Sequence, residues 1–341
     1  MSHAADGTRP APPKAPAPIG VGVTAYRPNL DALASLLAVI SQGGSKIWLF
    51  LNSPLSPEQK ARLRTAAPSG LQFLNDGRNL GLGVAYNHIV EAARAAGARQ
   101  LMILDQDSSP RTGIAAELCS TYELLRSTGE RPAVVGPLAV SAGGEQFKPP
   151  RIFRNRTERQ CGSAWPATFV ISSGSLLDLD ACTEIGPFRE DFFIDAIDIE
   201  WCFRAWSRGF SCWIDSAVRM PHRLGQGTIR LPLLGIHLVR QPPSRLHTYV
   251  RNQVAMLRLL HIPVSWRLRI VPYLLFQGLV YFAMCRGRRW ETVRAFTSGL
   301  VDGLRFRLGA GPQNRRQLPG DNAIDQVRVV EPADMTFARA R

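Results

Sequence analysis

Two acidic residues, Asp105 and Asp107, directly follow the apolar segment 101–104 in the sequence LMILDQDS. Residues i and i+2 of an extended strand point to the same face, so both carboxylates are expected to project together from the strand end. Neighbouring carboxylates repel each other unless a cation lies close to both. Hard divalent cations such as Mg²⁺ or Mn²⁺ prefer oxygen ligands and commonly bridge to phosphate oxygens. The pair therefore indicates a divalent metal that holds a diphosphate.

The same segment is also compatible with an acidic turn ahead of a helix. In that case Ser108, Ser109 and Pro110 would form the cap and the first turn. The spacing alone does not separate the two interpretations.

A glycine-rich segment, NLGLGVAYN at 79–87, is a second candidate site. Gly81 and Gly83 would permit a ligand to approach the backbone closely, and a helix that starts here would offer free N–H groups. A tight turn followed by a helix cap explains the glycines equally well.

Acidic and aromatic residues are concentrated between positions 188 and 210. Asp195 and Asp198 are three residues apart and would share one face of a helix. A carboxyl group beside Phe and Trp side chains has its pKa raised by desolvation, which suits a general base. The alternative is an ordinary capped helix, in which Asp198 is the N-cap and Glu200 pairs with Arg204.

His222 follows a segment typical of a strand and is a candidate third metal ligand. A histidine at the surface or satisfied in the core is the other interpretation.

Apolar runs and helical periodicities alternate through the first third of the chain. Strands are predicted at 19–25, 46–51, 71–74 and 100–104, and helices at 30–40, 57–66 and 83–96. This alternation is typical of a doubly wound, Rossmann-like α/β fold, with a mostly parallel sheet and helices on both faces. Ligands of such sheets bind beyond the carboxyl ends of the strands. The polar turns 26–29, 52–53 and 105–107 follow three such ends and are expected to converge on one crevice.

Basic residues are concentrated late in the chain of 341 residues, which has a formal net charge of +14. Between positions 230 and 316 there are 15 arginines and only two acids, Glu291 and Asp302. Such a segment suits anionic lipid head groups or nucleic acid. A non-enzymatic nucleic-acid-binding protein would account for this charge, but not for the clustered acids, which repel phosphate; we expect no nucleic-acid partner.

An apolar stretch at 271–285 is a candidate membrane helix. Fifteen residues of helix reach only about 22 Å, against a hydrocarbon core of about 30 Å. Pro272, Gln277 and Gly278 interrupt the stretch, which favours an interfacial or core helix over a spanning one.

The cysteines and the composition of the two chain ends help to define the expected domain organisation. Six cysteines lack a CxxC pair or regular spacing, which argues against a disulfide scaffold or a zinc site. The Pro- and Ala-rich start has no apolar run typical of a signal peptide. The expected organisation is a disordered leader at 1–18, a catalytic domain at 19–230 with halves 19–130 and 131–230, a basic helical region at 231–316 and a loose tail at 317–341.

Taken in order, these segments resemble the family 2 glycosyltransferases, in particular the bacterial rhamnosyltransferases that build lipopolysaccharide and capsule polysaccharides. The matching segments are VTAYRPN at 23–29, NLGLGVAYNHI at 79–89, ILDQDS at 103–108, SSGSLL at 172–177, FFIDAIDIEWCFRAWSRGF at 192–210 and HTYVRN at 247–252. The resemblance implies the nucleotide-diphospho-sugar transferase (GT-A) fold and an inverting mechanism.

The resemblance also implies roles for individual residues. Asp105 and Asp107 would hold the donor diphosphate and Mg²⁺ or Mn²⁺, with His222 as a further metal ligand. Asp198 matches the catalytic base. The residues that support this base would be Asp195, Glu200, Trp201 and Arg204. The donor side would be lined by Tyr26, Asn52, Asn79, Gly81 and Asn87. The acceptor edge would carry Gly174 and Ser175.

The implied reaction is rhamnosyl transfer from dTDP-rhamnose to a saccharide or lipid-linked acceptor during cell-surface polysaccharide synthesis. The implied location is cytoplasmic, peripheral on the anionic inner face of the bacterial cytoplasmic membrane. The chain departs from the family where Leu51-Asn52 replaces the usual Asp-Asn. Because an acid that would read the nucleobase is missing, a UDP-linked galactofuranose or glucose stays an alternative donor.

Overall fold

The computed structural model describes residues 19–68, 70–140, 160–221, 228–231, 236–239, 242–284 and 289–310. The expected leader, His222 and the expected loose tail lie outside the described residues.

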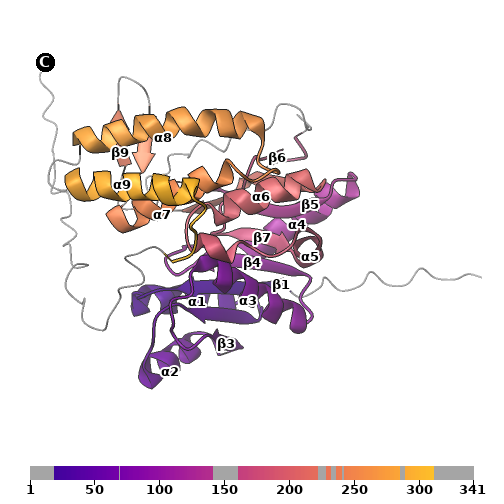
Figure 1. The fold of residues 1–341 in the computed structure, drawn as a ribbon. Helices are drawn as coiled ribbons and strands as arrows, with labels where there is room; N and C mark the ends of the chain where they lie inside the picture. The colour runs from indigo at the N-terminus through magenta and orange to yellow at the C-terminus, as the bar shows by residue number, and fades with distance from the viewer. Residues whose placement is uncertain are drawn as a thin grey trace, which may run out of the picture.

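Strands and helices alternate through the first third of the chain (Figure 1). The elements are β1 (Ile19–Ala25), α1 (Leu30–Ser41), β2 (Ile47–Leu51), α2 (Pro57–Ala66), β3 (Leu71–Leu74), α3 (Leu82–Ala95) and β4 (Gln100–Asp105). The order and type match the sequence prediction. The boundaries agree to within one residue, because apolar runs end at clear turn residues: Asn29 caps α1 through its side chain, and Ser56 and Gln59 form a capping box at α2.

Shorter strands and further helices follow. They are α4 (Ile114–Ser127), β5 (Pro132–Val140), β6 (Ala164–Pro166), β7 (Ser175–Asp178), α5 (Leu179–Ile185), the 3₁₀ helix η1 (Glu190–Phe192), α6 (Ile197–Ser207) and β8 (Ser211–Pro221). The last elements are β9 (Thr228–Leu231), β10 (Ile236–Val239), α7 (Pro243–Met256), α8 (Val264–Met284) and α9 (Arg289–Leu304). The expected basic helical region thus begins with an antiparallel strand pair, β9 and β10.

The main sheet has, within the described residues, the strand order β3-β2-β1-β4-β7-β5-β8-β6. Strands β1, β2, β3 and β4 are parallel, whereas β7 is antiparallel to both of its neighbours and β6 is antiparallel to β8. The chain moves outward from β1 to β3 and then returns to place β4 on the other side of β1. This reversal creates a switch point beyond the carboxyl ends of β1 and β4, where ligands of open α/β sheets bind.

Helices cover both faces of the sheet, and each face has its own hydrophobic core. Helices α1, α2 and α4 pack through Leu37, Leu63 and Leu118 against one face. Helices α3, α5 and α6 pack through Ile89, Ile185 and other buried side chains against the opposite face. The predicted helix-covered, mostly parallel sheet is therefore confirmed.

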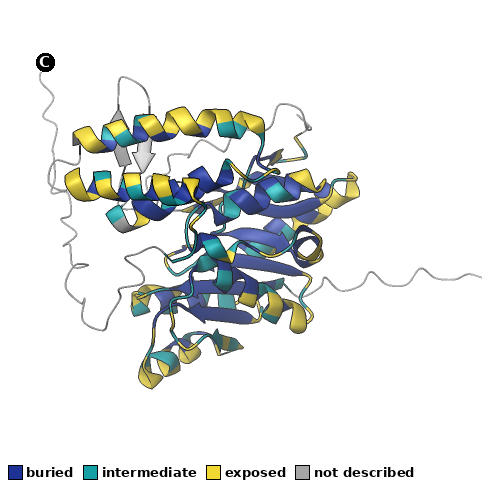
Figure 2. Ribbon diagram, viewed as in Figure 1, coloured by how far each residue is buried: buried dark blue, intermediate teal, exposed yellow. Residues whose placement is uncertain are grey.

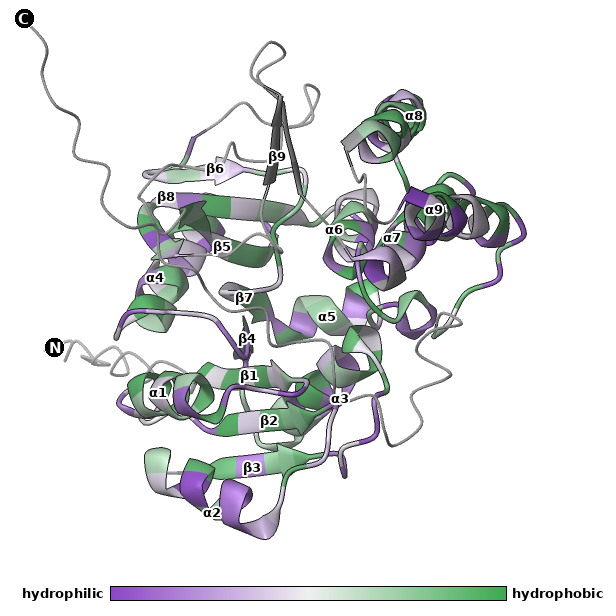
Figure 3. Cartoon of the chain, turned by 90° about the vertical axis from the view of Figure 1, so that its left-hand side faces the viewer, coloured by the Kyte–Doolittle hydropathy of each residue, from purple (hydrophilic) through white to green (hydrophobic). Residues whose placement is uncertain are grey.

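The last three helices form a separate layer beside α6 (Figures 1 and 3). Gly299 and Gly303 of α9 face α7, and a Cβ at either position would lie 2.5 Å from the carbonyl oxygen of His247 or 2.6 Å from that of Arg251. Only glycines permit the two helix backbones to approach this closely. The carbonyl-lined contact explains why α7 and α9 form one tightly packed pair.

Two local interpretations need correction. The helix proposed to start at Ser108–Pro110 is wrong, because α4 begins only at Ile114 after Gly113. The helix expected at 271–285 is longer at its start, since α8 runs from Val264 to Met284. None of the helices among the described residues has the length and apolar character required to span a bilayer.

Candidate active site

Three polar turns meet at the carboxyl ends of β1, β2 and β4, as the sequence predicts. The backbone N–H of Tyr26 donates to Oε1 of Gln106 at 2.6 Å, which joins the β1 turn to the β4 turn. The backbone N–H of Arg27 donates to Oγ of Ser53 at 2.7 Å, which joins the β1 turn to the β2 turn. These side-chain bonds fix the floor of the candidate site at the switch point of the sheet.

The turn after β4 holds Asp105 and Asp107 at different depths. Asp105 is the last residue of β4, and its backbone N–H donates to Oγ of Ser108 at 2.9 Å. That hydroxyl lies 2.7 Å from the hydroxyl of Ser173. Asp107 lies within the turn and is exposed. The turn therefore presents one half-buried and one open carboxylate, not two residues of a continuing strand.

The electrostatic environment of Asp105 is unfavourable for its charged form. Burial and the negative charges of Asp107 and Asp198 raise the pKa of Asp105 to about 6, against the opposing effects of Arg245 and the Thr24 hydroxyl. Asp105 is therefore close enough to Asp107 and to Asp198 for each of them to repel it. Together with Asp195, these residues are called the acid cluster below. A divalent cation would relieve this repulsion.

Asp198 lies at the start of α6, across from the β4 turn. Its carboxylate accepts hydrogen bonds from the backbone N–H groups of Ser172, at 3.2 Å, and Ile199, at 2.9 Å. Burial raises the pKa of Asp198 above its usual value, although these bonds oppose the rise. The N-cap of α6 is Ala196, so the alternative in which Asp198 caps the helix is wrong. Asp198 is thus a positioned carboxylate whose basicity exceeds that of an exposed aspartate.

The loop ahead of α6 has a strained backbone. Phe193, Asp195 and Ala196 have φ values of 62°, 67° and 62°, a region that side chains disfavour. The side chain of Asn252 holds this loop by donating to the carbonyls of Phe192, Ile194 and Asp195 at 3.0, 2.8 and 2.9 Å. Helix α7 therefore fixes the conformation that places Asp195 beside Asp198.

Arg251 supports the same loop from the neighbouring position of α7. It is fully buried and donates to the carbonyls of Phe192, at 3.0 Å, and Gly309, and to Oδ1 of Asn252. The backbone N–H of Gly309 in turn donates to the carbonyl of Asp191 at 2.6 Å. Residues 191–195 are therefore held between α7 and the segment after α9.

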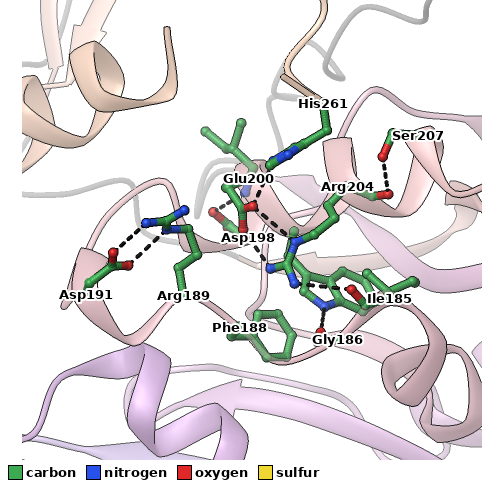
Figure 4. Close-up of polar contacts among 12 residues, drawn as sticks. Ile185, Gly186, Phe188, Arg189, Asp191, Asp198, Glu200, Arg204, Ser207 and His261 are labelled. Atoms are coloured by element: carbon green, nitrogen blue, oxygen red, sulfur yellow. Dashed lines mark hydrogen bonds and ion pairs between the residues drawn. The ribbon is translucent and has the colours of Figure 1, made fainter. Parts of the chain in front are cut away.

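Glu200, Trp201 and Arg204 belong to α6, and Figure 4 shows Glu200 in contact with Arg204 and His261. The buried Glu200 carboxylate lies 2.8 Å from Arg204 and 2.8 Å from Nε2 of His261. Burial alone would raise the pKa of Glu200, but His261 and Arg204 hold it below its usual value. Trp201 stacks on Phe188 with centroids 5.0 Å apart. These three residues fix α6 in place, which is a positioning role.

Asn52, Asn79 and Gly81 lie around one loop on the expected donor side. The amide of Asn52 is buried, accepts from the N–H of Leu80 at 2.9 Å and donates to the Gly81 carbonyl at 3.4 Å. A Cβ at Gly81 would lie 2.6 Å from the carbonyl oxygen of Phe193. Gly81 is therefore required for contact with the strained loop, while Asn79 is half-buried beside it.

Asn87 and Tyr26, both expected on the donor side, differ in burial. Asn87 is buried in α3, where its amide exchanges hydrogen bonds with the backbone of Phe188 at 2.8 and 3.0 Å and donates to Glu190 at 2.9 Å. Its polar atoms thus fasten α3 to the segment before α6. Tyr26 is half-buried at the end of β1, with the Arg27 guanidinium 5.4 Å from its ring centroid.

Gly174 and Ser175 lie where β7 enters the sheet beside β4. The N–H of Gly174 donates to the carbonyl of Ile103 at 2.7 Å, and both residues are buried. They place Ser172 and Ser173 against the acid cluster. Among the described residues, which exclude His222, no three His, Cys, Asp or Glu side chains are arranged as a metal site.

Two residues at the candidate site, Tyr86 and Arg245, are not predicted from the sequence. The Tyr86 hydroxyl donates to Oγ of Ser172 at 2.9 Å, directly behind the N–H that binds Asp198. Arg245 reaches Asp195 from the first turn of α7. Tyr86 lies within the glycine-rich segment and Arg245 lies two residues before the HTYVRN segment, so proximity to these motifs was the available signal.

Comparison with known proteins gives one relative over most of the chain. The Shigella flexneri protein described as dTDP-rhamnosyl transferase RfbF is 26% identical over 300 residues, which cover 86% of this chain and 97% of the relative. No family model matches the chain.

The fold is similar to that of a solved glycosyltransferase. S. aureus TarS superposes with a TM-score of 0.51 and 11% identity; the match covers 84% of this chain but only 49% of TarS, so the chain spans about half of that protein. A shorter TarS chain in complex with UDP-GlcNAc superposes with a TM-score of 0.49 and 11% identity over 84% of this chain and 81% of that one. The first of these two superpositions, with a TM-score of 0.51, confirms the GT-A, nucleotide-sugar transferase fold.

Proposed function

We propose that this chain, a glycosyltransferase of the nucleotide-sugar transferase fold, transfers rhamnose from dTDP-rhamnose to a saccharide or lipid-linked acceptor with inversion at the anomeric carbon. The similarity to a dTDP-rhamnosyl transferase over almost its full length supports the donor. The observation that carries the reaction type is the set of contacts that joins Asp198 to the turn of Asp105. The Asp198 carboxylate accepts from the N–H of Ser172, and the hydroxyl of the next residue, Ser173, lies 2.7 Å from that of Ser108, which binds the N–H of Asp105. The product would serve cell-surface polysaccharide synthesis.

Asp198 supplies the base in this proposal. The acceptor hydroxyl donates its proton to the Asp198 carboxylate as its oxygen attacks the anomeric carbon from the face opposite the diphosphate. The raised pKa of Asp198 strengthens it as a proton acceptor, and the N–H groups of Ser172 and Ile199 orient it. Tyr86 holds Ser172 in place behind this carboxylate.

Asp105 and Asp107 fit a divalent cation. Their oxygens suit Mg²⁺ or Mn²⁺. Burial is the main cause of the raised pKa of Asp105, and a cation would remove the repulsion by Asp107 that adds to it. When bound, the metal would neutralise charge that develops on the departing diphosphate. His222, as a further ligand, remains part of the proposal.

A donor assay tests the proposed reaction. With Mn²⁺ present, release of nucleoside diphosphate is expected from dTDP-rhamnose and not from UDP-galactofuranose or UDP-glucose, measured with a lipid-linked saccharide acceptor. Selective turnover of a UDP-sugar would contradict the dTDP-rhamnose assignment, while turnover of no nucleotide sugar would contradict the proposed enzyme activity.

Metal dependence is tested with a chelator in the same assay. Excess EDTA is expected to abolish the rate, because Asp105 and Asp107 lose their cation, and added Mn²⁺ is expected to restore it. An unchanged rate in EDTA would contradict the proposed metal dependence.

The outer face of α8 supports a location on the anionic inner face of the cytoplasmic membrane. Its exposed apolar residues recur every three or four positions and so form one stripe: Val264, Leu268, Val271, Leu275, Leu279 and Phe282. Figure 2 shows this side of α8 as exposed, while Ile270, Leu274 and Tyr281 pack toward α7 and α9. Three arginines are exposed on α8 and α9, namely Arg269 on α8 and Arg289 and Arg294 on α9. An apolar stripe with flanking arginines suits an anionic lipid surface.

Vesicle flotation tests this location. The full chain is expected to float with vesicles that contain phosphatidylglycerol and less with vesicles of phosphatidylcholine alone. The double change Leu275→Glu and Leu279→Glu should reduce flotation on the anionic vesicles severalfold, because it introduces charge into the exposed apolar stripe that would contact the lipid. Leu124→Glu, at an exposed leucine of α4, is the matched control and should float like the parent. Equal flotation on both vesicle types would contradict the proposal.

A further inference from the structure

Arg245 is a cation whose position relative to the acid cluster is well defined. It lies in the first turn of α7, where its Nε is 3.0 Å and its Nη2 is 2.9 Å from Oδ1 of Asp195. Both of these nitrogens belong to one edge of the planar guanidinium. Because two nitrogens of the same edge contact Asp195, this edge of the guanidinium is turned toward the acid.

The two partners of this ion pair differ in exposure. The Asp195 side chain is 7% exposed, whereas that of Arg245 is 46% exposed. The contacts of Arg245 with Asp195 go through Nε and Nη2, and the buried Oδ2 of Asp195 has no hydrogen-bond partner among the described residues. The acid therefore anchors one edge of the guanidinium and leaves the other edge free to bind an anion.

Arg245 also interacts electrostatically with the metal-binding acids. The charge of Asp195, followed by those of Asp105 and Asp198, raises the pKa of Arg245. Arg245 in turn opposes the rise in the pKa of Asp105. Arg245 therefore lies close enough to Asp105 and Asp198 for the charges to interact.

The anchor itself is rigid. The left-handed backbone of Asp195 is held by Asn252, whose amide binds the Asp195 carbonyl, and Asn252 and Arg245 belong to the same helix. One element thus supplies both the cation and the clamp that orients it. Such a built support is typical of a group that must keep its position when a ligand arrives.

We propose that Arg245 binds the diphosphate of the nucleotide-sugar donor through the free edge of its guanidinium. The inference rests on the proposed function, because it takes the donor diphosphate to lie at Asp105. A diphosphate carries two or more negative charges into a cluster of carboxylates, so a fixed cation beside the metal lowers the free energy of the bound and the departing diphosphate. Asp195 is then the residue that positions Arg245.

Binding of nucleotides to the full chain tests the assignment by isothermal titration with dTDP, UDP and thymidine, in Mn²⁺ and again in EDTA. Arg245→Gln is expected to weaken dTDP binding at least tenfold and to leave thymidine binding unchanged, since only the diphosphate contacts the guanidinium. Arg245→Lys should retain part of the affinity, because the charge is kept and the fork is lost. Arg99→Gln, at an exposed arginine just before β4, is the matched control.

The outcomes separate this inference from the proposed function. A parent protein that binds neither dTDP nor UDP more tightly than thymidine would overturn the proposed function and with it the role of Arg245. A parent that prefers dTDP, together with an Arg245→Gln variant that keeps this preference, would overturn the role of Arg245 alone. Equal weakening of dTDP and thymidine binding, with a lower melting temperature of the unliganded protein, would show that Arg245 only holds the loop.

Discussion

Replacement of Asp198 by asparagine is expected to lower kcat by roughly 10²–10⁴-fold while the affinity for dTDP stays close to that of the parent. The N–H groups of Ser172 and Ile199 bind different oxygens of Asp198, so one of these two bonds is lost in the variant. Asparagine fills the same volume and keeps the other bond through its amide oxygen. It cannot take a proton from the acceptor hydroxyl. The measurement is initial-rate kinetics with dTDP-rhamnose, combined with dTDP titration of the unreacted variant.

Asp180→Asn is the matched control for this change. Asp180 is an exposed acid in the first turn of α5 and lies outside the candidate site. Its replacement removes the same charge and should leave kcat and melting temperature unchanged. An Asp198→Asn variant with full turnover would mean that another group accepts the proton, whereas a loss confined to dTDP affinity would place Asp198 on the donor and not on the acceptor.

Replacement of Asn252 by leucine is expected to lower the free energy of unfolding by about 3–5 kcal/mol. Asn252 is completely buried, and its amide binds three backbone carbonyls of the loop before α6. Leucine would leave these carbonyls without donors and would remove the amide oxygen that accepts from Arg251. The loop should then leave its strained conformation, so turnover should fall more steeply than stability alone explains. Denaturant unfolding and initial rates at 20 °C below the melting temperature measure the two effects.

The adjacent residue provides a stringent comparison. Gln253 is equally buried, but its Oε1 has no hydrogen-bond partner among the described residues. Gln253→Leu should therefore change stability by far less than Asn252→Leu and should leave turnover intact. If both substitutions had the same small effect, the loop would not depend on the Asn252 amide.

The first third of the fold was predictable from the sequence because its signals are local. Each strand from β1 to β4 is an apolar run that ends at a turn residue, and parallel strands bring their carboxyl ends to one edge. The convergence of the three turns follows from this rule alone. The helix start expected at Ser108 shows the limit of such local signals. Ser108 is a residue type that caps helices, but its hydroxyl accepts from the backbone N–H of Asp105 and contacts the hydroxyl of Ser173.

The contacts that shape the site were not predictable, because they join distant positions. Asn87 was expected beside the nucleotide, yet its amide binds the backbone of Phe188, 101 residues away. The ion pair of Arg245 and Asp195 spans 50 residues. No periodicity or spacing in the sequence encodes such a partner. What the sequence did indicate was the residue types: amides and acids within short motifs whose polar atoms had to be satisfied somewhere.

The close contact of α9 with α7 determines how far a functional fragment must extend. A chain cut at residue 230 would keep the sheet and every acid of the cluster, but it would lose Arg251 and Asn252, which hold the loop beside Asp198. A cut after α7 would still remove Gly309, which binds both Arg251 and the backbone of Asp191. The helices α7 and α9 are thus needed to hold the loop of the candidate site. A chain truncated before Gly309 should therefore lose activity even though it keeps the sheet.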